Sequence, residues 1–322
     1  MAEIHFIIFI KVMLLKKNHI TSLLFSLLML PIFLLSPRNN TLAEENGLIP
    51  DNQKILRMVL VPEKNIFEQQ RRYKFITDYL SSKMDMNFIV EIMENYGDIS
   101  DAFIDGKADV GFFGSFSYVL THAKASIEPI VRPMLLNNDS TYRGYIFVRK
   151  DSNIETVKDM KNKSLVLVDK ATTAGYIFQL FYFKYYGIKD LEDYFSRIYF
   201  ARSHDAAAWA VYVGEADIGG AKDHVFNSLL EEYPDFEEQM MILAESPDVP
   251  SNGLAVRKDL NPAIKLRIKI LLLSLHETSE GQEVLKNFGA LKFIETDNDD
   301  YKVLYHMVNQ LGIDLQSYSY KK

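Results

Sequence analysis

The sequence of 322 residues contains no cysteine, which excludes disulfide bonds, thiolate metal sites, a cysteine nucleophile and a lipidated N-terminal cysteine. It also lacks the GxSxG, HExxH, P-loop and GxGxxG motifs of common enzyme classes, so we expect no enzymatic activity and no cofactor. Low-complexity tracts are absent, and only 25% of the residues are charged. The 48% of hydrophobic residues can fill the core of one large or two medium globular domains.

Acidic residues outnumber basic ones outside the N-terminal segment. Residues 1–43 carry a net charge of +3, which leaves −10 on residues 44–322. A chain this acidic is not expected to bind nucleic acid or a phospholipid surface through bulk charge. Any anion that it binds must therefore be held by a local set of hydrogen-bond donors.

The N-terminal segment has the pattern of an export signal. Three lysines, Lys11, Lys16 and Lys17, precede the apolar run 20–35, and a Thr-Leu-Ala sequence ends at Ala43. We predict a signal peptide over residues 1–43, with a retained membrane anchor as the alternative, and a polar linker over 44–53. Either prediction places the rest of the chain in the periplasm or in another compartment outside the cytoplasm.

Strands and helices alternate in the first part of the chain. The pattern predicts three strands and two intervening helices, over 56–61, 67–83, 87–92, 97–106 and 110–113. Such alternation indicates an α/β fold with mixed, mainly parallel sheets flanked by helices. Three further helices are predicted towards the C-terminus, over 262–275, 280–288 and 299–311.

A pattern of six residues occurs twice, as Gly-Lys-Ala-Asp-Val-Gly over 106–111 and as Gly-Glu-Ala-Asp-Ile-Gly over 214–219. Each copy follows a helical stretch and leads into a short strand, so we expect the same helix-to-strand corner in two similar lobes. Asp109 and Asp217 are expected to orient the backbone there rather than to perform chemistry.

Two extended apolar runs, 145–149 and 254–257, are interpreted as crossings between these lobes. The prediction is a two-lobed molecule with two hinge crossings, in which each lobe moves as a rigid body when the cleft closes. Lobe I is predicted over residues 54–145 and 254–322, and lobe II over residues 146–253.

The stretch Ser164–Tyr176 combines a buried strand, a polar turn and the start of a helix. Thr172 and Thr173 stand at the helix start, where free backbone N–H groups, the positive end of the helix dipole and two hydroxyl groups can hold an anion. An ordinary capped helix has the same pattern, so this stretch alone does not define a site.

Five motifs occur in a fixed order along residues 55–311. They are Tyr96 before the first Gly-x-x-Asp corner, Tyr142 in Y-R-G-Y-I-F-V-R-K-D-S, D-K-A-T-T-A-G over 169–175, His204 in S-H-D-A-A-A-W-A-V, and S-P-D-V-P-S-N-G over 246–253. In these motifs the chain resembles the phosphonate-, phosphite- and phosphate-binding proteins of ABC importers. The resemblance implies a two-lobed type II periplasmic-binding fold and a monomer that captures a small oxyanion. It also implies an ABC permease in the inner membrane as the partner.

The resemblance further implies which residues hold the ligand. Thr172 and Thr173 would supply hydroxyl and backbone donors, and tyrosines of the facing lobe would supply phenolic donors. His204 would donate from its ring, with a charge that could follow pH. The full candidate set is Tyr96, Ser115, Tyr142, Thr172, Thr173, Ala174, His204, Asp223 and Asn252. Because donors come from both lobes, affinity would depend on closure.

Two positions depart from the family pattern. Ala174 stands where the family has a second serine, so one hydroxyl donor is lost while the backbone N–H remains. Asn252 stands where the family often has an aspartate that contacts a protonated ligand group, and an amide offers no ionised acceptor. This argues against an aminoalkyl phosphonate and leaves phosphite, phosphate and methylphosphonate open. We expect Asn252→Asp to raise the affinity for an amine-bearing phosphonate relative to phosphite.

Two alternative functions fit parts of the sequence. Tyr96, Tyr142 and His204, together with Asp223, could form a ferric site like that of iron-binding proteins of related fold, since phenolate and carboxylate oxygens suit this cation. A chain that keeps its N-terminal anchor could instead be a ligand sensor for a membrane partner.

Overall fold

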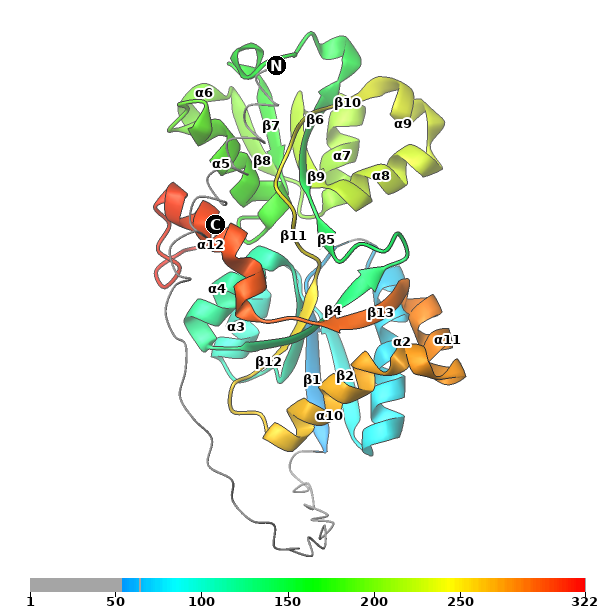
Figure 1. Cartoon of the computed structure of the whole chain (residues 1–322). Helices are drawn as coiled ribbons and strands as arrows, with labels where there is room; N and C mark the ends of the chain where they lie inside the picture. Colours follow the sequence, from blue (N-terminus) through cyan, green and yellow to red (C-terminus); the bar gives the residue numbers. More distant parts are fainter. Residues whose placement is uncertain (1–53, 64, 322) are drawn as a thin grey trace, which may run out of the picture. The chain divides into compact units, whose positions relative to one another are not determined.

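The computed structural model describes residues 54–63 and 65–321, so the predicted signal or anchor over 1–43 and the linker over 44–53 lie outside the described residues. Two larger mixed sheets and one two-stranded sheet make up the β-structure of this part of the chain (Figure 1). Within the same residues, no helix combines the length and the apolar character that crossing a bilayer requires.

The six-stranded sheet defines lobe I. Its strands lie in the order β13-β4-β12-β3-β1-β2, and β3, β1 and β2 run parallel. Their bounds are β1 (Ile55–Leu60), β2 (Asn87–Ile92), β3 (Val110–Phe113), β4 (Glu128–Leu135), β12 (Gly253–Val256) and β13 (Ala290–Glu295). The helices of this lobe are α2 (Ile66–Met84), α3 (Asp98–Ile104), α4 (Ser115–Ala125), α10 (Pro262–Leu273) and α11 (Ser279–Phe288).

The five-stranded sheet defines lobe II. Its order is β10-β6-β9-β7-β8, with β9, β7 and β8 parallel. The strands are β6 (Gly144–Arg149), β7 (Ser164–Leu167), β8 (Arg197–Phe200), β9 (Ile218–Lys222) and β10 (Met240–Glu245). The helices are α5 (Phe178–Tyr185), which continues a short π-helix η4 (Thr173–Ile177), α6 (Leu191–Tyr194), α7 (His204–Tyr212), α8 (Asp223–Glu232) and α9 (Pro234–Gln239). Both lobes thus have the expected α/β architecture.

The crossings between the lobes lie a few residues before the predicted ones. Strand β5 (Thr141–Tyr142) pairs antiparallel with β11 (Val249–Pro250), and this small sheet lies between the two larger ones (Figure 1). The predicted crossings, 145–149 and 254–257, are instead strands β6 and β12 inside the sheets. Their apolar character comes from burial between two neighbouring strands, as expected for a central strand.

The repeated six-residue pattern forms the same corner in both lobes, as expected. Asp109 accepts a hydrogen bond from the Arg57 N–H at 2.8 Å, and Asp217 accepts one from the Ser164 N–H at 2.8 Å. In each case the carboxylate ties its corner to the backbone of the neighbouring parallel strand, β1 in one lobe and β7 in the other. The leading glycine of each copy has a positive φ, 67° in one and 80° in the other, which closes the preceding helix.

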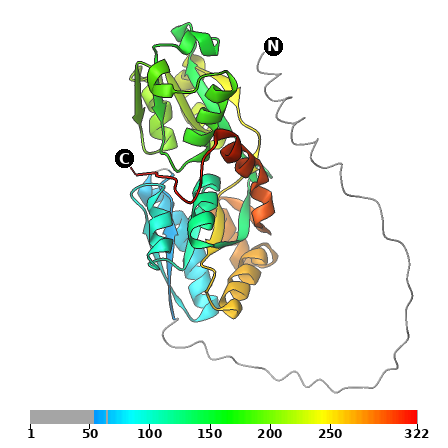
Figure 2. The same ribbon diagram turned by 90° about the vertical axis from the view of Figure 1, so that its left-hand side faces the viewer.

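The C-terminal segment, residues 302–321, contacts both lobes. It begins with α12 (Lys302–Leu311), which packs on α4 of lobe I and on α5 and η4 of lobe II, and which Figure 2 shows in red beside the junction of the lobes. Farther on, the Tyr318 hydroxyl donates to the Lys170 carbonyl of lobe II at 2.7 Å. The same ring packs edge-on against Phe116 of lobe I, with the centroids 5.4 Å apart.

Candidate functional site

The candidate residues gather where the strands of the two lobes end. Tyr96 follows β2 and Ser115 follows β3 in lobe I, whereas the turn 169–172 follows β7 and Lys222 ends β9 in lobe II. The carboxyl ends of parallel strands are the usual place for a ligand in open α/β sheets. The arrangement therefore places the site between the lobes, beside the hinge.

The threonine hydroxyls at the helix start already have partners. Thr172 donates to the Asp169 carbonyl at 2.6 Å within its own turn. The Thr173 hydroxyl accepts from the Phe116 N–H at 2.9 Å, which joins η4 of lobe II to the first turn of α4 in lobe I. The Thr173 oxygen is only an acceptor in this bond, so its own proton is not used by it and can still point to an anion. The backbone at the helix start is also available, because the first helical hydrogen bond comes from Ile177 N–H.

Glycine is required next to these threonines. A Cβ atom at Gly175 would lie 2.4 Å from the side chain of Val168, which ends the preceding strand region. Ala174, immediately before it, is buried and packs with Tyr142 of β5. The backbone of Gly175 therefore lies directly against Val168, the residue after β7, and this contact fixes the direction in which η4 begins.

His204 is a neutral donor held in one tautomer. Its Nδ1 accepts from the backbone N–H of Lys222 at 3.2 Å, so the ring proton is on Nε2. Burial, together with the nearby Lys222 ammonium, lowers the pKa of His204 well below its usual range. The expectation that its charge follows pH was therefore wrong for the folded protein near neutral pH. Its Nε2 is buried and has no hydrogen-bond partner among the described residues.

Tyr96 and Asn252 carry two more buried polar atoms that lack a partner in the described part of the chain, Tyr96 Oη and Asn252 Nδ2. The ring of Tyr96, from lobe I, lies edge-on to that of His204, from lobe II, with the centroids 6.0 Å apart. Burial, with a smaller effect of the Glu63 carboxylate, raises the pKa of Tyr96 well above its usual range, so the phenol keeps its proton. Three proton-bearing groups thus lie buried and unpaired.

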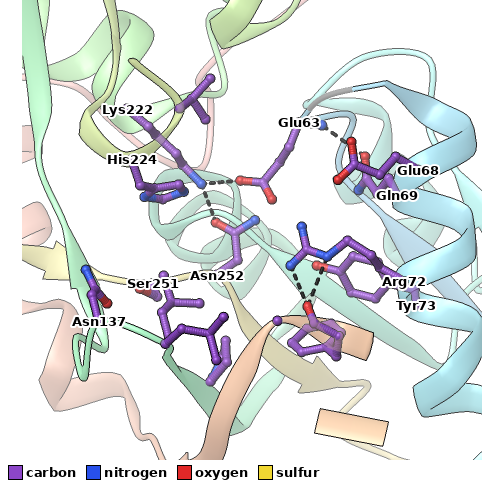
Figure 3. Close-up of a pocket in the computed structure, with 16 residues that line it drawn as sticks. Glu63, Glu68, Gln69, Arg72, Tyr73, Asn137, Lys222, His224, Ser251 and Asn252 are labelled. Carbon is purple, nitrogen blue, oxygen red and sulfur yellow. Dashed lines mark hydrogen bonds and ion pairs between the residues drawn. The ribbon is translucent and has the colours of Figure 1, made fainter. Parts of the chain in front are cut away.

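A buried ion pair lies beside these donors and was not predicted from the sequence. The ammonium of Lys222, which is only 3% exposed, pairs with the Glu63 carboxylate and donates to Asn252 Oδ1 at 2.7 Å (Figure 3). Burial by itself would raise the pKa of Glu63, but Lys222 and, less strongly, His224 lower it to about 2. Lys222 also lies 4.5 Å from the centroid of the Tyr142 ring.

A cavity of about 310 Å³ opens next to the ion pair. Lys222, Glu63 and Asn252 belong to its lining, as do Arg72 and Ser251 (Figure 3). Tyr96, His204 and Thr173 are not part of this lining and lie deeper in the closed contact between the lobes. Asn252 and Lys222 therefore connect the cavity to the buried donors.

Ser115 and Asp223 have structural partners. The Ser115 hydroxyl donates to the Pro250 carbonyl of the hinge at 2.6 Å. The Asp223 carboxylate accepts from the backbone N–H of Arg143 at 3.0 Å and from that of His224 at 2.7 Å. Both side chains thereby hold the hinge strands to their lobes.

The ferric alternative is not favoured by this geometry. Asp223 is occupied by the backbone of the hinge, and the raised pKa of Tyr96 opposes the phenolate that iron would need.

The model of a protein family matches residues 58–301, and its description is "ABC transporter, phosphonate, periplasmic substrate-binding protein". A probable phosphite-binding protein of an ABC transporter from Prochlorococcus marinus is 22% identical, over 91% of this chain and 96% of its own length. A phosphate-import protein from Mycolicibacterium smegmatis is 22% identical, over 67% of this chain and 70% of its own length.

Solved structures show the same fold. A binding-protein component of an ABC phosphonate transporter from Pseudomonas aeruginosa has a TM-score of 0.73 at 18% identity, covering 81% of this chain and 87% of that one. The complex of a Prochlorococcus marinus relative with methylphosphonate has a TM-score of 0.71 at 20% identity, covering 81% of this chain and 99% of that one. The expected two-lobed type II periplasmic-binding fold is thus confirmed.

Proposed function

The chain belongs to the family of periplasmic substrate-binding proteins of phosphonate ABC transporters, and on this premise we propose that it captures a phosphorus oxyanion between its lobes for an ABC permease. Phosphite, phosphate and methylphosphonate are the proposed ligands. Relatives that bind or import such anions support this choice.

Three buried donors beside the hinge that have no partner among the described residues carry the proposal. Tyr96 Oη, His204 Nε2 and Asn252 Nδ2 all bear protons, and burying such groups is costly unless an acceptor meets them. A tetrahedral oxyanion offers several acceptors at once, and hydrogen bonds to an ionised acceptor are about twice as strong as neutral ones. One donor comes from each lobe and one from the hinge, so a ligand that engages all three stabilises the closed form.

Calorimetric titration of residues 44–322 with phosphite, phosphate, methylphosphonate and sulfate tests the proposal. We expect His204→Ala and Tyr96→Phe to weaken binding of the preferred phosphorus oxyanion by about 1.5–3 kcal/mol each, as for hydrogen bonds to a charged group. Tyr199→Phe is the matched control, because the Tyr199 hydroxyl is also buried and without a partner in the described chain but lies on the edge strand β8. No binding of any phosphorus oxyanion, or equal losses in all three variants, would contradict the site.

We propose further that residues 1–43 direct export and that the mature protein works as a monomer beside its permease. The basic flank and the apolar run 20–35 support an export signal. The mass of the mature N-terminus distinguishes cleavage after Ala43 from a retained anchor, and light scattering gives the oligomeric state.

A further inference from the structure

Lys222 is a charged side chain surrounded by the groups that bind an ammonium ion. Its Nζ pairs with the Glu63 carboxylate and donates to the amide oxygen of Asn252 at 2.7 Å (Figure 3). It also lies 4.5 Å from the centre of the Tyr142 ring. A carboxylate, an amide oxygen and an aromatic face together are a complete receptor for a primary ammonium group. The receptor is buried, since Lys222 is 3% exposed and the Glu63 side chain 19%.

The three receptor groups and the ammonium come from different parts of the fold. Glu63 follows β1 of lobe I, Tyr142 lies in hinge strand β5, and Asn252 follows hinge strand β11. Lys222 ends β9 of lobe II and reaches them across the cleft. The protein therefore makes, with its own side chain, the bridge between lobes that the ammonium of a zwitterionic ligand could otherwise make.

The filled receptor adjoins the proposed oxyanion donors. The oxygen of Asn252 accepts from Lys222, and the backbone N–H of Lys222 holds His204 by its Nδ1. Within residues 54–63 and 65–321, Asn252 Nδ2 and His204 Nε2 have no hydrogen-bond partner. A substituent on a bound oxyanion that extends from these donors towards the cavity would thus meet Lys222. Burial disfavours the charged form, yet Glu63 and Tyr142 outweigh it and raise the pKa of Lys222, so the ammonium stays charged.

We propose that Lys222 permanently fills an ammonium receptor of Glu63, Asn252 and Tyr142, and thereby restricts the site to phosphorus oxyanions whose substituent carries no amine. This specificity rests on the proposed function, whereas the receptor itself does not. A ligand amine would face a like charge and would find its carboxylate already paired.

The receptor is tested without any phosphorus ligand. In Lys222→Ala, a cavity replaces the lysine side chain and Glu63 loses its partner, so a small primary amine should take its place. We expect ethylammonium chloride to raise the melting temperature of Lys222→Ala above its value in sodium chloride at equal ionic strength. The wild type and the double variant Lys222→Ala/Glu63→Gln should show no such rise. A Lys222→Ala protein that does not respond, or a double variant that responds equally, overturns the receptor.

Specificity is tested by titration with methylphosphonate and 2-aminoethylphosphonate. The wild type and Lys222→Arg should prefer methylphosphonate by at least about tenfold, and Lys222→Ala should shift the ratio towards 2-aminoethylphosphonate by about 10- to 100-fold, as for a charge-assisted hydrogen bond. Equal wild-type affinities for the two ligands overturn the inference even if Lys222→Ala does not fold. If the wild type binds neither these two phosphonates nor phosphite or phosphate, the proposed function fails, while the response to ethylammonium still decides the receptor.

Discussion

The backbone N–H of Lys222 donates to Nδ1 of His204 at 3.2 Å, so one residue both fixes the tautomer of the histidine and places an ammonium beside it. The imidazole is thereby a neutral Nε2–H donor inside the site. A fixed neutral donor binds an anion without a change of charge, and its contribution to affinity does not require acid.

This arrangement predicts how stability depends on pH through His204. The pKa of His204 is lowered in the folded state, so below about pH 6.5 the unfolded chain takes up a proton that the folded protein does not. Stability should therefore fall as the pH drops from about 7 to 5. His204→Asn keeps an acceptor for Lys222 N–H but cannot titrate, so we expect a smaller fall in chemical denaturation. Parallel curves for the two proteins would contradict the buried neutral imidazole.

The ion pair of Glu63 and Lys222 predicts a second effect of pH on stability, which comes from a paired carboxylate and lies at lower pH. Glu63→Gln leaves a buried ammonium without its carboxylate, and the expected cost near neutral pH is about 3–5 kcal/mol. Because the pKa of Glu63 is lowered to about 2 in the folded state, its contribution is complete above about pH 4.5 and is lost as the pH falls towards 2. The difference in unfolding free energy between the two proteins should shrink in that range. A difference of equal size at about pH 7 and pH 3 would show that the pair is not formed.

The Thr173 hydroxyl predicts a role in the closure of the two lobes. Its hydroxyl accepts from the Phe116 N–H of the other lobe, and Thr173→Val would leave this buried N–H unpaired. We expect ligand affinity to fall roughly 5- to 150-fold in Thr173→Val and to stay near wild type in Thr173→Ser, which keeps the acceptor. Titration of the proposed oxyanion checks this, and equal affinities of the valine and serine variants would exclude the hydroxyl as the cause.

Asn252 now has a different prediction from the one that the sequence suggested. With Lys222 in place, Asn252→Asp adds a second carboxylate to an ammonium that is already paired, so it should not create a site for a ligand amine. We expect the preference against 2-aminoethylphosphonate to persist in Asn252→Asp and to be lost only when Lys222→Ala is added. Titration of the single and double variants decides between the two expectations, and a gain in the single variant would favour the earlier one.

The sequence predicted those strands and turns whose signals lie within a few neighbouring residues. The strand 110–113 and the glycine corners at 106 and 214 were found because periodicity, left-handed glycine and a strand-starting aspartate all lie within a few residues. Strands β4 and β13 were not predicted, and the crossings were placed too late. Edge position, bulges and interrupting prolines weaken the strand pattern there, and only the pairing shows which apolar run is central.

In the candidate site, too, residues with a local motif were predicted and residues that depend on long-range pairing were not. The motif order identified Tyr96 and His204, whose rings meet edge-on, and Asn252, which contacts Lys222. Glu63 and Lys222 were missed because each is an ordinary charged residue at a strand end, and their pairing spans 159 positions of the sequence. The signal available was a single lysine ending the buried run Ile218–Lys222, since a charge there requires a partner.

The C-terminal segment gives the molecule a third link between its lobes, which begins with Val303 packed against the hinge strands β5 and β11 and ends at the Tyr318–Lys170 hydrogen bond. Two adjacent hinge strands alone would let the lobes swing apart about one axis. With α12 lying on both lobes and Tyr318 tied to Lys170, a wide swing must first detach this segment. A small twist of the lobes then costs less free energy than a wide opening. We expect the backbone amide hydrogens around residue 318 to exchange with solvent at a rate that follows the release of bound ligand.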